Sequence, residues 1–118
     1  MILIDTSVWI DHFRKHNEEL ADLLLNDQVQ VHHFVIGELA CGDLKQREET
    51  LECLHNLPQA AQASPAEIFH FIHMHQLYSK GLGFIDVHLL AATFLSKTKI
   101  WTLDLKLENQ AKKLGVNF

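Results

Sequence analysis

The first eleven residues, Met1–Asp11, join a short apolar run to a helix start through a single carboxylate. Residues 2–4 (Ile-Leu-Ile) show no polar alternation, which is typical of a strand covered on both faces in a parallel sheet. Asp5 follows at once, and Thr6 and Ser7 are residue types that begin helices. In open α/β sheets, ligands bind at the carboxyl ends of strands. A lone Asp there is more often a helix cap, so this stretch alone leaves its role open.

The rest of the chain alternates short apolar segments with helical patterns. Val29–His32 and Lys99–Thr102 are predicted strands, and Val116–Phe118 is a predicted edge strand. Predicted helices cover residues 6–13, 18–25, 34–41, 46–57, 65–80, 85–95 and 105–114. Strands that alternate with helices indicate a three-layer α/β fold with a mainly parallel central sheet.

The clearest local signal is Ser64-Pro65-Ala66-Glu67. Ser caps a helix, Pro suits the first helical position, and Glu three residues after Ser closes a capping box. The helix that begins there is predicted to end at Gly81, because glycine is the usual residue beyond a helix end.

Length and composition limit the class of protein. The 118 residues fit one domain, residues 1–118, and no apolar run is long enough to span a membrane. Two cysteines and no visible secretory leader favour a cytoplasmic location. The net charge of −5 argues against a polyanionic partner, unless several carboxylates bind cations.

Four acids lie in unusually apolar segments, whereas most other acids have polar neighbours. They are Asp5, Glu38, Asp86 and Asp104. An isolated carboxylate is costly to bury, and the apolar segments contain no lysine to pair with these four. A hard divalent cation such as Mg²⁺ or Mn²⁺ would satisfy them and would keep water ligands and open positions. Each acid alone is more simply explained as a helix cap or an ion-pair partner, but that explanation weakens for all four together.

The chain resembles PIN-domain ribonucleases, and most of all the VapC-type toxins of prokaryotic toxin–antitoxin pairs. The resemblance rests on four segments in the family's order, which span nearly the whole chain. They are Ile-Asp-Thr-Ser-Val-Trp-Ile-Asp (4–11), Ile-Gly-Glu-Leu-Ala-Cys-Gly (36–42), Phe-Ile-Asp-Val-His-Leu-Leu-Ala-Ala (84–92) and Trp-Thr-Leu-Asp (101–104).

The resemblance implies a metal-dependent endoribonuclease whose metal and catalytic acids are Asp5, Glu38, Asp86 and Asp104. It also implies that Thr6 or Ser7 supports the metal site or the scissile phosphate, and that Thr102 supports Asp104. Mg²⁺ or Mn²⁺, an RNA substrate, a homodimer and a cognate VapB-type antitoxin are the further expectations, with the antitoxin's C-terminal segment in the active groove.

One departure from the family concerns the residues after the fourth acid. Many members carry a further acid or an Arg there, whereas this chain has Leu105 and Lys106. The departure leaves open whether one or two metal ions bind, and it indicates that Lys106 faces the RNA.

Two other function classes are alternatives to a metal-dependent endoribonuclease. A phosphohydrolase with an aspartyl nucleophile needs a second Asp two residues after the first, and Ser7 occupies that position. A PIN-like module that only binds RNA or protein is the main alternative to a nuclease. Such degenerate modules tend to lose carboxylates, and all four are present here.

Overall fold

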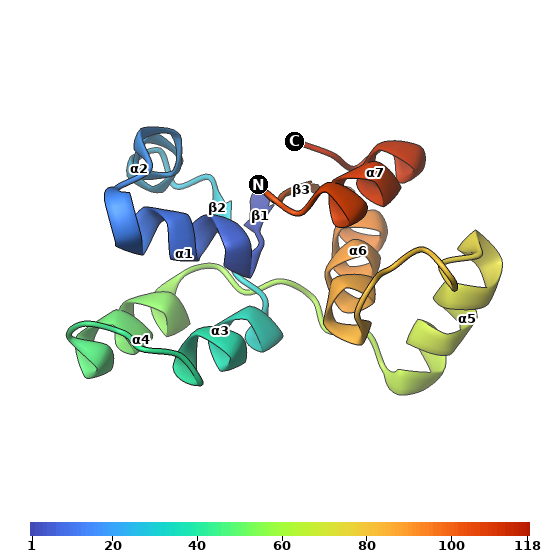
Figure 1. The fold of residues 1–118 in the computed structure, drawn as a ribbon, viewed down its shortest axis with the longest axis horizontal. Coiled ribbons are helices and arrows are strands. Elements are labelled where there is room, and N and C mark those ends of the chain that lie inside the picture. Colours follow the sequence, from blue (N-terminus) through green and yellow to red (C-terminus); the bar gives the residue numbers. More distant parts are fainter.

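Three short parallel strands form the centre of the protein, with helices on both sides. The computed structural model describes residues 1–118. The strands are β1 (Ile2–Ile4), β2 (Val29–Gln30) and β3 (Lys99–Trp101). The helices are α1 (Thr6–Lys15), α2 (Glu18–Leu25), α3 (His33–Ala40), α4 (Arg47–Asn56), α5 (Pro65–His75), α6 (Phe84–Ser96) and α7 (Leu105–Leu114). Figure 1 shows the sheet between α1–α4 and α5–α7, which confirms the predicted three-layer α/β fold.

The strand order β2-β1-β3 places the first strand of the chain in the middle of the sheet. Both of its pairings are parallel, and Leu3 lies opposite Ile100. The backbone N–H of Asp5 continues the pairing by donating to the carbonyl of Trp101 at 2.9 Å. The carboxyl ends of β1 and β3 therefore meet at one edge of the sheet, as parallel pairing requires.

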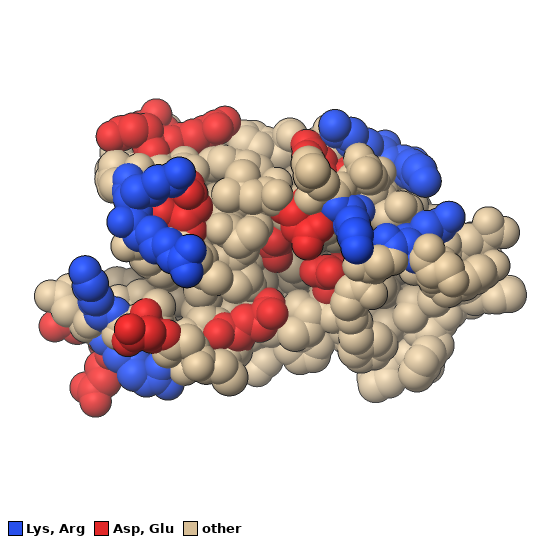
Figure 2. Space-filling view, viewed as in Figure 1, with Lys and Arg blue, Asp and Glu red and all other residues tan.

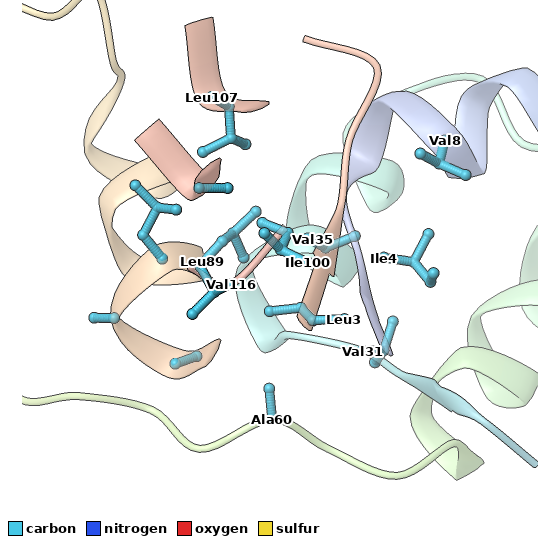
Figure 3. Close-up of a cluster of buried hydrophobic side chains, with 14 of the residues drawn as sticks. Leu3, Ile4, Val8, Val31, Val35, Ala60, Leu89, Ile100, Leu107 and Val116 are labelled. Carbon is cyan, nitrogen blue, oxygen red and sulfur yellow. The ribbon is translucent and has the colours of Figure 1, made fainter. Parts of the chain in front are cut away.

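The two faces of β1 are both buried, which explains its continuous apolar sequence. Leu3 and Ile4 are fully buried. In Figure 3, Leu3 points toward Leu89 of α6, whereas Ile4 points to the other side, toward Val8 of α1. Helices on both sides thus bury successive residues of the same strand.

The predicted end of α5 is wrong: the helix ends at His75 and not at Gly81. Gln76 adopts a left-handed conformation with φ of 52°, and the N–H of Leu77 donates to the carbonyl of Ile72 at 3.1 Å. This is the bonding of a Schellman motif, in which an apolar residue after the helix end packs back onto the helix. Leu77 is buried, and its burial compensates for a Gln in a conformation that favours glycine.

Two predicted strands are shorter than expected. The segment Val29–His32 contributes only Val29–Gln30 to the sheet, and Val31 forms an isolated parallel bridge with Gln59. The C-terminal segment forms one bridge, between Asn117 and Ile100. No helix has both the length and the apolar character that crossing a membrane requires.

A candidate active site of four carboxylates

Asp5 is the most buried of the four acids, with 6% of its surface exposed. It follows β1 directly and precedes the first residue of α1. Its Oδ2 accepts hydrogen bonds from the hydroxyls of Ser7 and Thr102, each at 2.7 Å. Two hydroxyls therefore fix the orientation of this carboxylate. Ser7 is two residues away in the chain, and Thr102 is 97 residues away.

Thr102 also connects Asp5 to Asp104. Its hydroxyl accepts a hydrogen bond from the backbone N–H of Asp104 at 3.0 Å while donating to Asp5. The Ser7 hydroxyl accepts in the same way from the N–H of Leu103, also at 3.0 Å. The turn after β3 is thus tied to the start of α1, so that two acids lie at the same edge of the sheet.

Asp104 caps α7. Its Oδ1 accepts from the backbone N–H groups of Lys106 and Leu107, at 2.9 and 3.2 Å. A carboxylate at a helix N-terminus is favoured by the unpaired N–H groups and the positive end of the helix dipole. Asp104 is therefore a helix cap, as the simpler explanation predicts, but capping uses only one of its two carboxylate oxygens.

The other two acids are positioned by helices from opposite sides of the sheet. Glu38 lies on α3, and its Oε1 accepts a hydrogen bond from the Thr6 hydroxyl at 2.7 Å. Asp86 lies in the first turn of α6, and its Oδ2 accepts from the N–H of Gly83 at 2.8 Å. Sequence reasoning did not identify Gly83; a glycine three residues before an acid at a helix start was the available signal.

The four carboxylates share one arrangement: one oxygen of each accepts hydrogen bonds, and the other accepts none. The oxygens without a hydrogen bond are Oδ1 of Asp5, Oε2 of Glu38, Oδ1 of Asp86 and Oδ2 of Asp104. The protein contains three ion pairs, Asp11–Lys15, Glu18–His16 and Glu108–Lys112, and none involves these acids. Each acid is therefore held in place by hydrogen bonds but is not neutralised by a basic side chain.

The pKa of Asp86 is raised by burial and in part by the negative charges of the other three acids. Burial is the largest cause that raises this pKa above its ordinary value, and the negative charges of Asp5, Asp104 and Glu38 raise it further. The hydrogen bond from Gly83 acts in the opposite direction. Figure 2 shows acidic side chains gathered in a hollow at the middle of this face, between α1 and α3 on one side and α6 and α7 on the other. We call Asp5, Glu38, Asp86 and Asp104 the acidic cluster.

The donor set of the acidic cluster fits a hard divalent cation. Its free atoms are carboxylate oxygens, which Mg²⁺ and Mn²⁺ prefer, and its mutual repulsion is what a cation would relieve. As the side chains lie, no three His, Cys, Asp or Glu residues form a direct metal-ligand group. Mg²⁺ needs fewer direct ligands than such a group, because it usually binds through one or two carboxylates and keeps several waters.

A cavity of about 710 Å³ opens beside the acidic cluster. Its wall combines apolar and charged side chains of α1 and α3 with the segment that leads to α4. The lining residues are Ile10, Phe13, Arg14, Glu38, Leu39, residues 42–46 and Thr50. Because Glu38 belongs to both, the cavity extends the acidic cluster along the surface of α1.

Replacing Thr102 by Val is expected to lower the free energy of unfolding by about 1–3 kcal/mol. Valine keeps the shape of the side chain but removes the hydroxyl that bonds Asp5 and Asp104, both near the buried sheet edge. Urea unfolding measures the loss. The matched control is Thr93→Val, because the buried Thr93 hydroxyl bonds only carbonyls of its own helix. Equal losses in the two variants would contradict a linking role for Thr102.

The comparisons with known proteins agree with this fold. The family model described as the PIN domain matches residues 2–113. Two curated proteins called Ribonuclease VapC32, from Mycobacterium tuberculosis strains CDC 1551 / Oshkosh and ATCC 25618 / H37Rv, are each 38% identical over 117 residues. The match covers 98% of this chain and 94% of each relative. The crystal structure of PAE2754 from Pyrobaculum aerophilum has a TM-score of 0.58 at 16% identity, covering 97% of this chain and 94% of the other, and supports the fold.

Proposed function

This chain belongs to the PIN-domain family, and on that basis we propose that residues 1–118 form one PIN domain that cleaves RNA as the toxin of a toxin–antitoxin pair. One observation carries the proposal: four carboxylates from four separate segments converge, each with one oxygen free and no basic partner. The ribonuclease relatives match over nearly the full chain, which supports the same activity here. A binding module without catalysis tends to lose such carboxylates, and all four are present here.

We propose Mg²⁺ or Mn²⁺ as the cofactor, held by the acidic cluster. When bound, such an ion polarises a phosphoryl oxygen and lowers the pKa of a water. Asp5 would hold it through Oδ1, because Ser7 and Thr102 already occupy and orient Oδ2. Glu38, Asp86 and Asp104 would share the remaining ligation, and one of these carboxylates would accept the proton of the attacking water.

The hydroxyl side chains act by fixing the acids. Thr6 holds Glu38, while Ser7 and Thr102 hold Asp5 and the turn that carries Asp104. Oε2 of Glu38 and Oδ1 of Asp5 accept no hydrogen bond, and a phosphodiester would lie beside these oxygens.

The proposed macromolecular partners are RNA, a VapB-type antitoxin and a second copy of the chain, in the cytoplasm. The cavity beside Glu38 supports an antitoxin segment, because it offers apolar side chains and the Arg14 guanidinium next to the acidic cluster. Co-expression with the antitoxin and light scattering of each species would test both partners.

The test of the proposed function is cleavage of single-stranded RNA by protein freed of any inhibitor. We expect cleavage with Mn²⁺ or Mg²⁺, none after treatment with EDTA, and recovery when Mn²⁺ is added in excess. Binding of Mn²⁺ should be visible by calorimetry and should raise the unfolding temperature. Cleavage that is unchanged in EDTA, or a folded protein that neither binds Mn²⁺ nor cuts RNA, would contradict the proposal.

A further inference from the structure

The side chain of Lys106 lies directly on Gly81. A Cβ built on Gly81 would meet Lys106 Cδ at 2.6 Å, Nζ at 3.1 Å and Cε at 3.2 Å. Real Cβ atoms essentially never approach another heavy atom as closely as 2.6 Å, so a side chain at position 81 would displace the flexible end of Lys106 from this position. Gly81 also has φ of +76°, which glycine adopts without strain. The end of Lys106 is therefore seated on the segment between α5 and α6.

The position of Lys106 in α7 is electrostatically unfavourable. It stands in the first turn, where the positive end of the helix dipole disfavours a cation. The rest of α7 follows the opposite and favourable pattern, with Glu108 in the first turn and Lys112 and Lys113 in the last. Lys106 forms none of the protein's ion pairs and remains exposed. Its charge contributes nothing evident to stability.

Lys106 and the segment that contains Gly81 are linked by backbone hydrogen bonds to two acids of the acidic cluster. The backbone N–H of Lys106 donates to Asp104, and its side chain lies on Gly81. Two residues after Gly81, the N–H of Gly83 donates to Asp86. The ammonium group is thus held beside the segments that position Asp104 and Asp86, and it brings positive charge to the side of the acidic cluster formed by α6 and α7. Figure 2 shows basic side chains over this side of the hollow, and they are lysines, because the two arginines of the chain lie on α1 and α4.

We propose that Lys106, seated on Gly81, binds a phosphate oxygen of the RNA at the α6–α7 side of the acidic cluster. An anionic ligand explains an unpaired cation held at an unfavourable helix position next to acids that would otherwise repel RNA. Gly81 acts as a positioning residue, because its missing side chain leaves the space for the lysine. The inference rests on the proposed ribonuclease function and adds to it the residue that holds the substrate.

Removal of the charge is the first test. Lys106→Met keeps most of the aliphatic stem, and we expect it to lower single-turnover cleavage of RNA by about 10- to 100-fold. Lys106→Arg should keep most of the activity. Lys113→Met is the matched control, because it removes a lysine from the other end of the same helix. Calorimetric Mn²⁺ affinity should be unweakened in all three, since no lysine ligates the metal.

The second test measures binding without cleavage. In an Asp5→Asn background with Mg²⁺ present, Lys106→Met should reduce the slope of log affinity for single-stranded RNA against log salt by about 0.7, the loss of one phosphate contact. Lys113→Met should leave the slope unchanged. An unchanged slope after Lys106→Met would overturn the proposal.

The third test uses the glycine seat. Gly81→Ala places a methyl group where Lys106 lies, whereas Gly115→Ala introduces the same backbone strain, at φ of +71°, with no neighbour within 4 Å. We expect Gly81→Ala, but not Gly115→Ala, to lower cleavage, and by a smaller factor than Lys106→Met, because the displaced lysine keeps its charge, when each is assayed below its unfolding temperature. The double variant Gly81→Ala/Lys106→Met should be no slower than Lys106→Met alone. If the two substitutions lower the cleavage rate additively, Gly81 does not act by positioning Lys106.

The outcomes separate this inference from the proposed function. If the unaltered protein does not cleave RNA with metal, the proposed function fails, and the salt slope still reports whether Lys106 binds RNA. If the unaltered protein cleaves RNA and Lys106→Met cleaves it equally fast, the inference on Lys106 fails and the ribonuclease function stands.

Discussion

Replacing Asp5 by Asn is expected to lower the rate of RNA cleavage by about 10³-fold or more while the fold is kept. The free Oδ1 is the oxygen that would hold the metal ion, and an amide in its place loses several kcal/mol of charge stabilisation in the transition state. The hydrogen bonds of Ser7 and Thr102 converge on Oδ2, and the carbonyl oxygen of Asn can accept both. Single-turnover cleavage of a labelled RNA measures the effect.

The control for Asp5→Asn is the same change at an exposed acid away from the hollow. Asp22→Asn on α2 removes one negative charge without touching the acidic cluster and should cleave RNA at the unaltered rate. Circular dichroism and thermal unfolding should show that the Asp5 variant is folded. A folded Asp5→Asn protein with full activity would exclude Asp5 as a metal ligand.

Asp86→Asn is expected to lower cleavage by about 10²- to 10³-fold and, at the same time, to raise the stability of the metal-free protein at neutral pH. The pKa of Asp86 is raised in the folded state by burial and by three neighbouring carboxylates, so its ionised form destabilises the fold. Asn removes the charge and can still accept the hydrogen bond from Gly83. Activity and metal-free stability should therefore change in opposite directions.

The stability difference between the unaltered protein and Asp86→Asn should depend on pH with a defined sign. At low pH, where Asp86 is protonated in both states, the variant and the unaltered protein should be equally stable. As the pH rises from the ordinary value of 3.8 through the raised pKa, the folded state holds its proton longer, so the unaltered protein loses stability relative to Asp86→Asn. Urea unfolding in EDTA across this range measures the difference. Excess Mn²⁺ should reverse it, because the unaltered protein binds the ion more tightly.

The capping box at the start of α5 supplies a control of opposite sign. Glu67 accepts from the N–H of Ser64 at 2.8 Å, in the same geometry as Asp86 and Gly83, but its pKa is lowered by the hydrogen bonds from Ser64. Glu67→Gln should therefore lower the stability at neutral pH, and the difference should vanish as the pH falls through the lowered pKa. If Glu67→Gln and Asp86→Asn change the stability at neutral pH in the same direction, the charge of the acidic cluster is not the cause of the Asp86→Asn effect.

Local signals in the sequence predicted several helix boundaries because the residues that cause them are adjacent in the chain. Asp104 and Gly115 define the ends of α7, the first by capping N–H groups and the second by adopting φ of 71°. The end of α5 was missed because Gln76 takes a left-handed conformation that its side chain does not favour. The burial of Leu77 decides that conformation, and it depends on tertiary packing that no local pattern reports.

The candidate site was predictable only in part, because some of its features are local in the sequence and others depend on tertiary contacts. Carboxylates in apolar segments can be recognised one by one, and the family resemblance orders them. The hydroxyl of Thr102 between Asp5 and Asp104 depends on β1 and β3 being neighbours, which follows from the sheet order and not from either segment. The contact between Lys106 and Gly81 joins α7 to a turn and has no sequence signal beyond the two residues themselves.

The central strand comes from the beginning of the chain, and its neighbour β3 comes from near the end. During translation, Asp5 is made well before Thr102 and Asp104, because 97 residues separate Asp5 from Thr102. Until then the first carboxylate lacks the hydroxyl that orients it and the fourth acid is missing. The acidic cluster, and with it the proposed cleavage of RNA, can therefore form only after the chain has been synthesised beyond Asp104.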